Sequence, residues 1–174
     1  MTEIRRYSVW LLPEEPAADT FKRLIDNLSE RYFGPKFAPH VTLLGWVTGS
    51  EARLIEKTKA LAADLRTLHP RSVGLDGESY YFRCLYAKLE KSTELLEAHA
   101  LASEAFGGGY AQDYLPHLSL LYGHLPRTEK TMLYDEMRDR VLREFTIDRL
   151  QLVRITVSVQ DWQAVVACTL PAGI

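Results

Sequence analysis

The chain has 174 residues, of which 47% are hydrophobic and 25% are charged, and its formal net charge is −2. This composition is typical of a soluble globular protein, and the length fits one domain or one domain of two lobes. The net charge does not favour stable binding to long nucleic acid, which needs a clearly basic face, but a small anionic ligand needs only a local site. The N-terminal apolar run YSVWLL stops at Pro13, too short for a signal peptide core or a membrane span. We therefore expect a cytoplasmic protein that does not associate with a membrane.

The first half of the chain is expected to form a strand, a helix, a strand and a helix in turn. The run RYSVWLL is rich in β-forming residues and predicts a strand over 6–12. Apolar residues at helical spacing predict a helix over 17–32, which the sequence FGPKFAP ends before a second strand, HVTLLGWV, over 40–47. A second helix is expected after the sequence TGSE, because Thr48 and Glu51 have the spacing of a capping box.

The second half repeats this order and adds a hairpin. The expected elements are a short strand in RSVGLDG, a longer strand over 79–90, a helix over 92–106 that GGG terminates, a strand in HLSLLYG, a helix over 127–143, and a hairpin of strands 145–158 and 162–170.

One sequence pattern occurs twice, as FAPHVTLL at 37–44 and YLPHLSLL at 114–121. In each half a strand and a helix precede the motif, and a second helix follows it. We interpret this as an internal duplication within a single domain, 1–174, whose lobes cover roughly 1–78 and 79–174 and can exchange strands. The predicted fold class is α+β, a two-lobed pseudo-twofold domain with antiparallel sheets around a central cleft and helices on the outside.

The repeated motif places a histidine and a hydroxyl on the same side of each strand. Because side chains alternate along a strand, His40 and Thr42 share one face, and so do His117 and Ser119. Twofold symmetry sets the two pairs opposite each other, where one imidazole can accept a proton while the other donates one. Each hydroxyl can donate a hydrogen bond to a bound oxyanion. We predict that the histidines are catalytic, that the hydroxyls bind phosphate, and that water is the nucleophile.

A metal site is the alternative use of two histidines. Catalytic zinc usually has a third protein ligand, and the nearby Asp113 and His124 have no counterpart in the first half. No metal or other cofactor is therefore expected. The cysteines, Cys84 and Cys168, lie in strand-like runs and are interpreted as buried reduced thiols, with a single disulfide between them left open.

The paired motifs HVTL at 40–43 and HLSL at 117–120 resemble those of the 2H phosphoesterase superfamily. Within it the chain is most similar to the cyclic phosphodiesterases of plants and yeast, on the strand YSVW-LP, the approach GP-F-PHVT, the motif PHLSLLY and the strand WQAVVAC. The resemblance implies metal-independent hydrolysis of a cyclic phosphodiester on ribose to a phosphomonoester. It implies that His40 and His117 divide the roles of base and acid, in an order left open, while Thr42 and Ser119 bind phosphate oxygens.

The substrates implied by the resemblance are ADP-ribose 1'',2''-cyclic phosphate and nucleoside 2',3'-cyclic phosphates. A small cyclic nucleotide of this kind is the expected partner, and the protein is expected to be a monomer. Two other functions stay open on the same fold, namely processing of RNA 2',3'-cyclic ends and non-catalytic binding of nucleotides or RNA ends.

Aromatic residues near the motifs can hold a nucleobase by stacking. Trp10 in the first strand and Tyr122 at the end of the second motif strand are the candidates, with core packing as the open alternative for both. Strict alternation places Tyr122 on the face opposite His117, so it reaches the site only if the strand end twists. Trp46 and Trp162 are expected to be packing residues.

Overall fold

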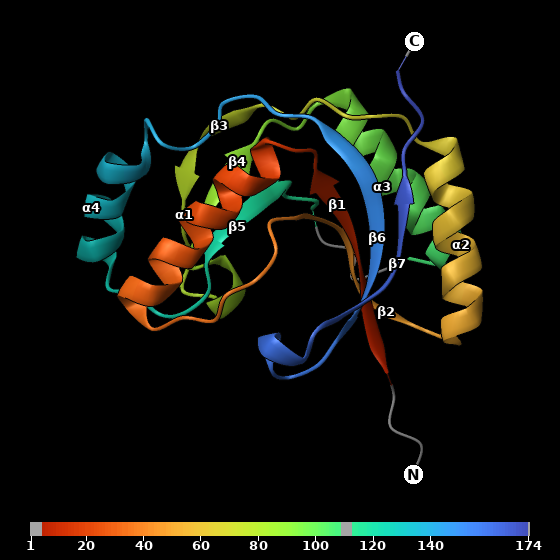
Figure 1. Cartoon of the computed structure of the whole chain (residues 1–174), viewed down its shortest axis with the longest axis horizontal. Helices are drawn as coiled ribbons and strands as arrows, with labels where there is room; N and C mark the ends of the chain where they lie inside the picture. Colours follow the sequence, from red (N-terminus) through yellow and green to blue (C-terminus); the bar gives the residue numbers. More distant parts are fainter. Residues whose placement is uncertain (1–4, 109–112, 174) are drawn as a thin grey trace.

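An antiparallel sheet forms the centre of the computed structural model, which describes residues 5–108 and 113–173 (Figure 1). Its seven strands in the described residues are β1 (Arg6–Pro13), β2 (Val41–Thr48), β3 (Ser72–Asp76), β4 (Leu85–Leu89), β5 (His117–Leu121), β6 (Ile147–Ile155) and β7 (Gln163–Thr169). Their order across the sheet is β3-β4-β5-β2-β1-β6-β7. The α-helices in the same residues are α1 (Ala17–Tyr32), α2 (Glu51–Asp64), α3 (Thr93–Phe106) and α4 (Arg127–Met137). The predicted α+β class is confirmed.

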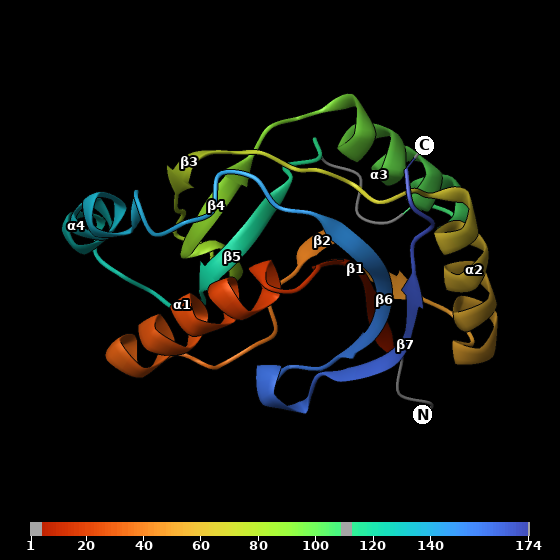
Figure 2. The same ribbon diagram turned by 45° about the horizontal axis from the view of Figure 1, so that its top comes forward.

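The sheet is weakly joined at its middle, between β2 and β5. Only one residue pair, Val41 with Leu118, is in register there, whereas the ladders of β1 with its two neighbours run along the whole strand. The two sides of this junction curve away from each other in Figure 2, with β3, β4 and β5 on one side and β2, β1, β6 and β7 on the other. Strand β6 therefore pairs with the first strand of the chain, and β7 pairs with the other edge of β6. The division into two lobes stays a prediction.

The helices pack across this junction. Helix α1 contacts β5, and α3 contacts β2, so each helix packs on the motif strand of the other half of the chain. Helix α2 packs on β6 and β7, while α4 lies against β3 (Figure 1). Within the described residues, no helix has the length and apolar character needed to cross a membrane.

Strand β1 shows how the sequence separates the two faces of the sheet. Tyr7, Val9 and Leu11 alternate into the main core beneath the helices. The intervening Trp10 packs on the opposite face, in a small cluster with Val153 and its neighbours. That opposite face carries the two motifs.

Two predicted elements are shorter in the structure. The strand expected over 79–90 is wrong in its first part, because Tyr81–Arg83 form a 3-10 turn and only Leu85–Leu89 are extended. Backbone hydrogen bonds within the loop, from Arg83 to Tyr80 and from Glu78 to Arg83, close this turn. The helix expected over 127–143 ends at Met137, after which the chain forms turns.

Two residue-level predictions also fail. The capping box is wrong, because the carboxylate of Glu51 accepts hydrogen bonds from the Tyr7 hydroxyl at 2.9 Å and from Arg154 Nε at 3.2 Å. Trp46 is not a packing residue. Its backbone has a positive φ of 58°, and its side chain is 49% exposed beneath the guanidinium of Arg6. Neither cysteine is in a disulfide; Cys84 is buried and Cys168 is half-buried.

Candidate active site

The junction between β2 and β5 brings the two histidine motifs together. Extending its antiparallel register by one residue in each direction sets His40 opposite Ser119 and Thr42 opposite His117. Residues opposite each other in antiparallel strands have Cβ atoms about 4.5–5.5 Å apart and point to the same face. Each imidazole therefore lies across from the hydroxyl of the other motif, and all four side chains share the sheet face that the helices do not cover.

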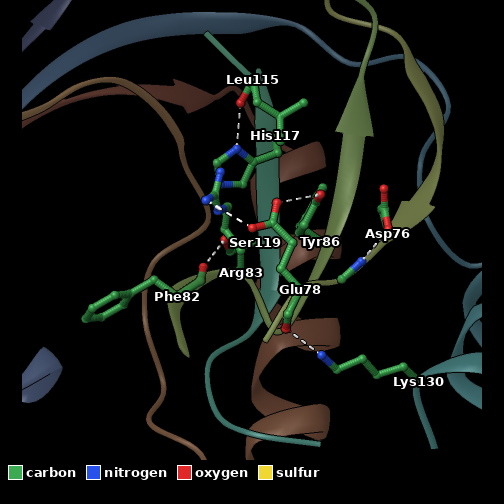
Figure 3. Close-up of polar contacts among 10 residues, drawn as sticks. Asp76, Glu78, Phe82, Arg83, Tyr86, Leu115, His117, Ser119 and Lys130 are labelled. Atoms are coloured by element: carbon green, nitrogen blue, oxygen red, sulfur yellow. Dashed lines mark hydrogen bonds and ion pairs between the residues drawn. The ribbon is translucent and has the colours of Figure 1, made fainter. Parts of the chain in front are cut away.

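Both histidines are held in the same way. His40 Nδ1 lies 2.8 Å from the carbonyl oxygen of Ala38, and His117 Nδ1 lies 2.7 Å from that of Leu115 (Figure 3). A carbonyl oxygen only accepts, so each Nδ1 carries the proton and each neutral ring keeps an Nε2 lone pair. The intervening prolines donate no hydrogen bond themselves and fix the chain on entering each strand. The duplicated sequence thus builds two equivalent proton acceptors.

Burial keeps both imidazoles neutral. It lowers the pKa of His40 to about 4, although the bond to Ala38 opposes the shift, and the nearby His117 lowers this pKa further. Burial also lowers the pKa of His117; there the Leu115 carbonyl and Glu78 raise it, while the charge of Arg83 lowers it. The charge of His117 acts on His40, which agrees with the β2–β5 register that brings the two motifs close together.

We expect the pKa of His40 to appear as an acid sensitivity of folding. His40 takes up a proton near pH 6.5 in the unfolded chain but only near pH 4 in the folded protein. Its contribution to the free energy of unfolding is therefore constant above pH 6.5. As the pH drops from 6.5 to 4, the free energy of unfolding falls by about 3 kcal/mol. Urea unfolding of wild-type protein and of His40→Gln across pH 4–7 measures it. In His40→Gln the free energy of unfolding should change less steeply with pH than in wild type. In His69→Gln, at an exposed histidine, it should change with pH as in wild type. Parallel slopes for all three would contradict a buried, neutral His40.

The two hydroxyls differ in their present partners. Ser119 is buried, and its Oγ donates a hydrogen bond to the carbonyl oxygen of Phe82 at 3.0 Å. Thr42 is half-buried, and among the described residues its Oγ1 has no hydrogen-bond partner. Thr42 can therefore donate to an oxyanion without rearrangement, whereas Ser119 must turn its hydroxyl away from Phe82. Their role as phosphate ligands stays a prediction.

Trp10 lies in the candidate site, where its ring packs against His40. Its ring stacks on His40 with centroids 3.5 Å apart and planes 7° apart, and in the β1–β2 ladder it is paired with Thr42. The indole covers one face of the imidazole and contributes to its burial. Trp162 packs edge-on to Trp10 at 5.7 Å, which agrees with the packing role expected for it.

Tyr122 follows the last residue of β5 and is buried. Its ring stacks on Phe37 with centroids 3.8 Å apart, and Phe82 and Trp162 lie edge-on to it. Burial raises the pKa of its phenol. Tyr122 therefore lies within an aromatic cluster, and its role in binding substrate stays a prediction.

Three residues beside His117 were not predicted. Tyr86 is paired with Ser119 in the β4–β5 ladder, and its ring centre lies 5.0 Å from that of His117. Arg83 and Glu78 form an ion pair at 3.0 Å next to the same ring (Figure 3). Tyr86 could have been found as the counterpart of Trp10, since each is paired with a motif hydroxyl, but Tyr86 lies 31 residues before His117 (117 − 86) whereas Trp10 lies 30 residues before His40 (40 − 10).

The histidines outside the motifs lie elsewhere. His99 bonds to the carbonyl of Leu43 and stacks on Tyr114, and His124 packs near Tyr81. In the part of the chain that the structure describes, no group of three or more His, Cys, Asp or Glu side chains is placed to hold a metal ion.

The α+β fold, the two His-x-Thr/Ser motifs on one sheet face and the match to a cyclic phosphodiesterase family define a 2H phosphoesterase. The chain belongs to the cyclic phosphodiesterase-like protein family, whose model matches residues 6–170, and it is a hydrolase. The cyclic phosphodiesterase of Arabidopsis thaliana is 30% identical over an alignment 185 residues long, gaps included, that covers 98% of this chain and 99% of that protein. The resemblance found in the sequence is confirmed.

Solved structures show the same fold at low identity. LigT of E. coli in complex with 3'-AMP has a TM-score of 0.61 at 14% identity, with 97% of this chain and 99% of that chain covered. TT0787 of Thermus thermophilus has a TM-score of 0.63 at 16% identity, with 96% of this chain and 98% of that chain covered.

Proposed function

We propose that this protein hydrolyses a cyclic phosphodiester on ribose to a phosphomonoester by two-histidine general acid–base catalysis. The proposed substrates are ADP-ribose 1'',2''-cyclic phosphate and nucleoside 2',3'-cyclic phosphates. The observation that carries the proposal is the equivalent setting of His40 and His117, each with Nδ1 bonded to the carbonyl two residues earlier and Nε2 left for a substrate. The family and the nucleotide-bound LigT structures support a nucleotide as the ligand.

In this mechanism the phosphorus lies between the two imidazoles. One neutral Nε2 takes a proton from water, whose oxygen attacks phosphorus as the bond to a ribose oxygen breaks on the opposite side. The other Nε2–H gives its proton to that leaving oxygen. Thr42 and Ser119 donate hydrogen bonds to the non-bridging oxygens. Proton exchange with solvent then restores the starting forms of both rings.

The surroundings of the two histidines favour one assignment of the base and the acid. His40, with its pKa lowered to about 4, is neutral at physiological pH and suits the role of base. Burial lowers the pKa of His117 as well, opposed by the Leu115 carbonyl and, more weakly, by Glu78; because His117 is the more exposed of the two histidines, it suits the role of acid. A bound anionic phosphate stabilises the charged form further.

Turnover of a substrate panel tests the function. The panel holds ADP-ribose 1'',2''-cyclic phosphate, the nucleoside 2',3'-cyclic phosphates and an oligoribonucleotide with a 2',3'-cyclic end, each in EDTA and followed by phosphorus NMR. We expect conversion of at least one small substrate to a monoester, and none by the double variant His40→Ala/His117→Ala. Preference for the oligoribonucleotide would favour RNA end processing. Activity lost in EDTA and restored by zinc would refute the metal-independent mechanism.

We expect a bell-shaped dependence of rate on pH, because one histidine must be neutral and the other charged. Burial lowers the pKa of both rings in the free enzyme, so the bell for kcat/KM should be centred below pH 6.5. Anionic substrate favours the imidazolium, so the alkaline limb of kcat should lie at higher pH than that of kcat/KM. Steady-state kinetics from pH 4 to 9 measure both limbs, and a flat profile would exclude the mechanism.

A further inference from the structure

Arg83 lies beside His117 with part of its guanidinium unused. Its Nε is buried and has no hydrogen-bond partner among the described residues, although buried donors in proteins are almost always paired. The rest of the group is held, since one terminal nitrogen lies 3.0 Å from a carboxylate oxygen of Glu78 and the guanidinium carbon lies 5.3 Å from the centre of the Tyr80 ring. The side chain of Arg83 as a whole is 34% exposed, so part of it is open to a ligand although Nε itself is covered.

The counter-ion of Arg83 is itself fixed by the surrounding residues. The carboxylate of Glu78 accepts a hydrogen bond from the Tyr86 hydroxyl at 3.3 Å, and its main-chain carbonyl accepts one from Lys130. Figure 3 shows Arg83 between this carboxylate and the ring of His117. The 3-10 turn that carries Arg83 also supplies the Phe82 carbonyl that Ser119 contacts. One short segment thus places a cation next to both residues of the second motif.

We propose that Arg83 binds the reacting phosphate group, with Glu78 as the counter-ion that holds the guanidinium in position and competes with the phosphate for it. A planar guanidinium with a spare N–H edge matches phosphate oxygens, and charge-assisted hydrogen bonds of this kind are among the strongest in proteins. The assignment to the reacting phosphate follows from the position of Arg83 beside His117 and Ser119. It rests on the proposed function for its substrate, but the binding of an anion can be measured without turnover.

The primary test is the affinity for inorganic phosphate, followed by amide shifts in 15N-labelled protein, which also report whether each variant is folded. Arg83→Gln should weaken phosphate binding on the order of 10- to 100-fold, and Arg83→Lys, which keeps the charge, should lose less. Glu78→Gln should bind phosphate more tightly, because the competing carboxylate is gone. Arg53→Gln, at an exposed residue of α2, should behave as wild type.

A neighbouring lysine distinguishes direct contact of Arg83 with phosphate from the general effect of a positive charge on this face. Lys88 is exposed and is paired with His117 in the β4–β5 ladder, so Lys88→Gln removes a positive charge on the same face. An affinity loss in Lys88→Gln as large as in Arg83→Gln, or an Arg83→Gln affinity within twofold of wild type, would overturn the proposal. Unchanged or weaker binding in Glu78→Gln would overturn the competing role given to Glu78.

Kinetics then decide which phosphate is bound. For Arg83→Gln, kcat/KM should fall equally on adenosine 2',3'-cyclic phosphate and on its 5'-phosphorylated form; a loss confined to the 5'-phosphorylated substrate would overturn the assignment to the reacting group. If phosphate binding follows Arg83 and Glu78 as expected but no diester in the panel is cleaved, the proposed function fails and the anion site stands. If diesters are cleaved and Arg83→Gln binds phosphate normally, the proposed function stands and the anion site at Arg83 fails.

Discussion

Replacing His40 or His117 by alanine should lower kcat by roughly 100- to 10,000-fold, the range typical of losing a general acid or base. The structure gives the reason, because each Nε2 is left on the shared sheet face while Nδ1 is bonded to a backbone carbonyl. Each single variant retains one imidazole at the junction, which cannot act as base and acid in the same step. Single-turnover rates on the best substrate of the panel, measured at the optimal pH, provide the test.

The double variant distinguishes a catalytic pair from two independent contributions. Its loss should be smaller than the product of the single losses, because the two rings act as a unit in one proton transfer cycle. His69→Ala is the matched control, since this histidine is exposed and lies outside both motifs. A single variant with a near-normal rate, or single losses that multiply, would contradict the paired mechanism.

Replacing Thr42 or Ser119 by alanine should lower kcat by about 100- to 1000-fold, because each removes a donor to the oxygens that gain charge in the transition state. The two variants should differ in stability. Ser119→Ala leaves the buried carbonyl of Phe82 without its donor and should lower the free energy of unfolding by about 1–3 kcal/mol, whereas Thr42 has no such bond among the described residues. Kinetics and urea unfolding on the same preparations separate the two effects.

The conservative exchanges Thr42→Ser and Ser119→Thr serve as controls for the hydroxyls. Both retain a donor at the same position, so they should keep most of the activity that alanine removes. Wild-type turnover in both alanine variants would rule out phosphate binding by these residues. Alanine-like losses in the conservative variants would point to packing rather than to the hydroxyl.

The chemistry of the site and most of the elements could be predicted from the sequence alone. The repeated Pro-His-apolar-hydroxyl pattern identified His40, Thr42, His117 and Ser119, because it repeats both the reactive groups and the strand alternation that gives them one face. Helix α1 follows from local apolar periodicity and strand β1 from its β-forming residues, and both signals depend only on neighbours in the chain. The expected monomeric state and cytoplasmic location stay predictions.

How the parts of the site meet is a property of the tertiary structure. The register between β2 and β5 places each histidine across from the hydroxyl of the other motif, and it is set by contacts between residues far apart in the chain. The pairing of β4 with β5 places Tyr86 on the face of His117, and the 3-10 turn brings Arg83 to the same ring where the sequence predicted a strand. Stacking of Trp10 on His40 likewise follows from the pairing of β1 with β2. Local periodicity carries no information on strand register or on which loop closes against which strand, because long-range packing fixes both.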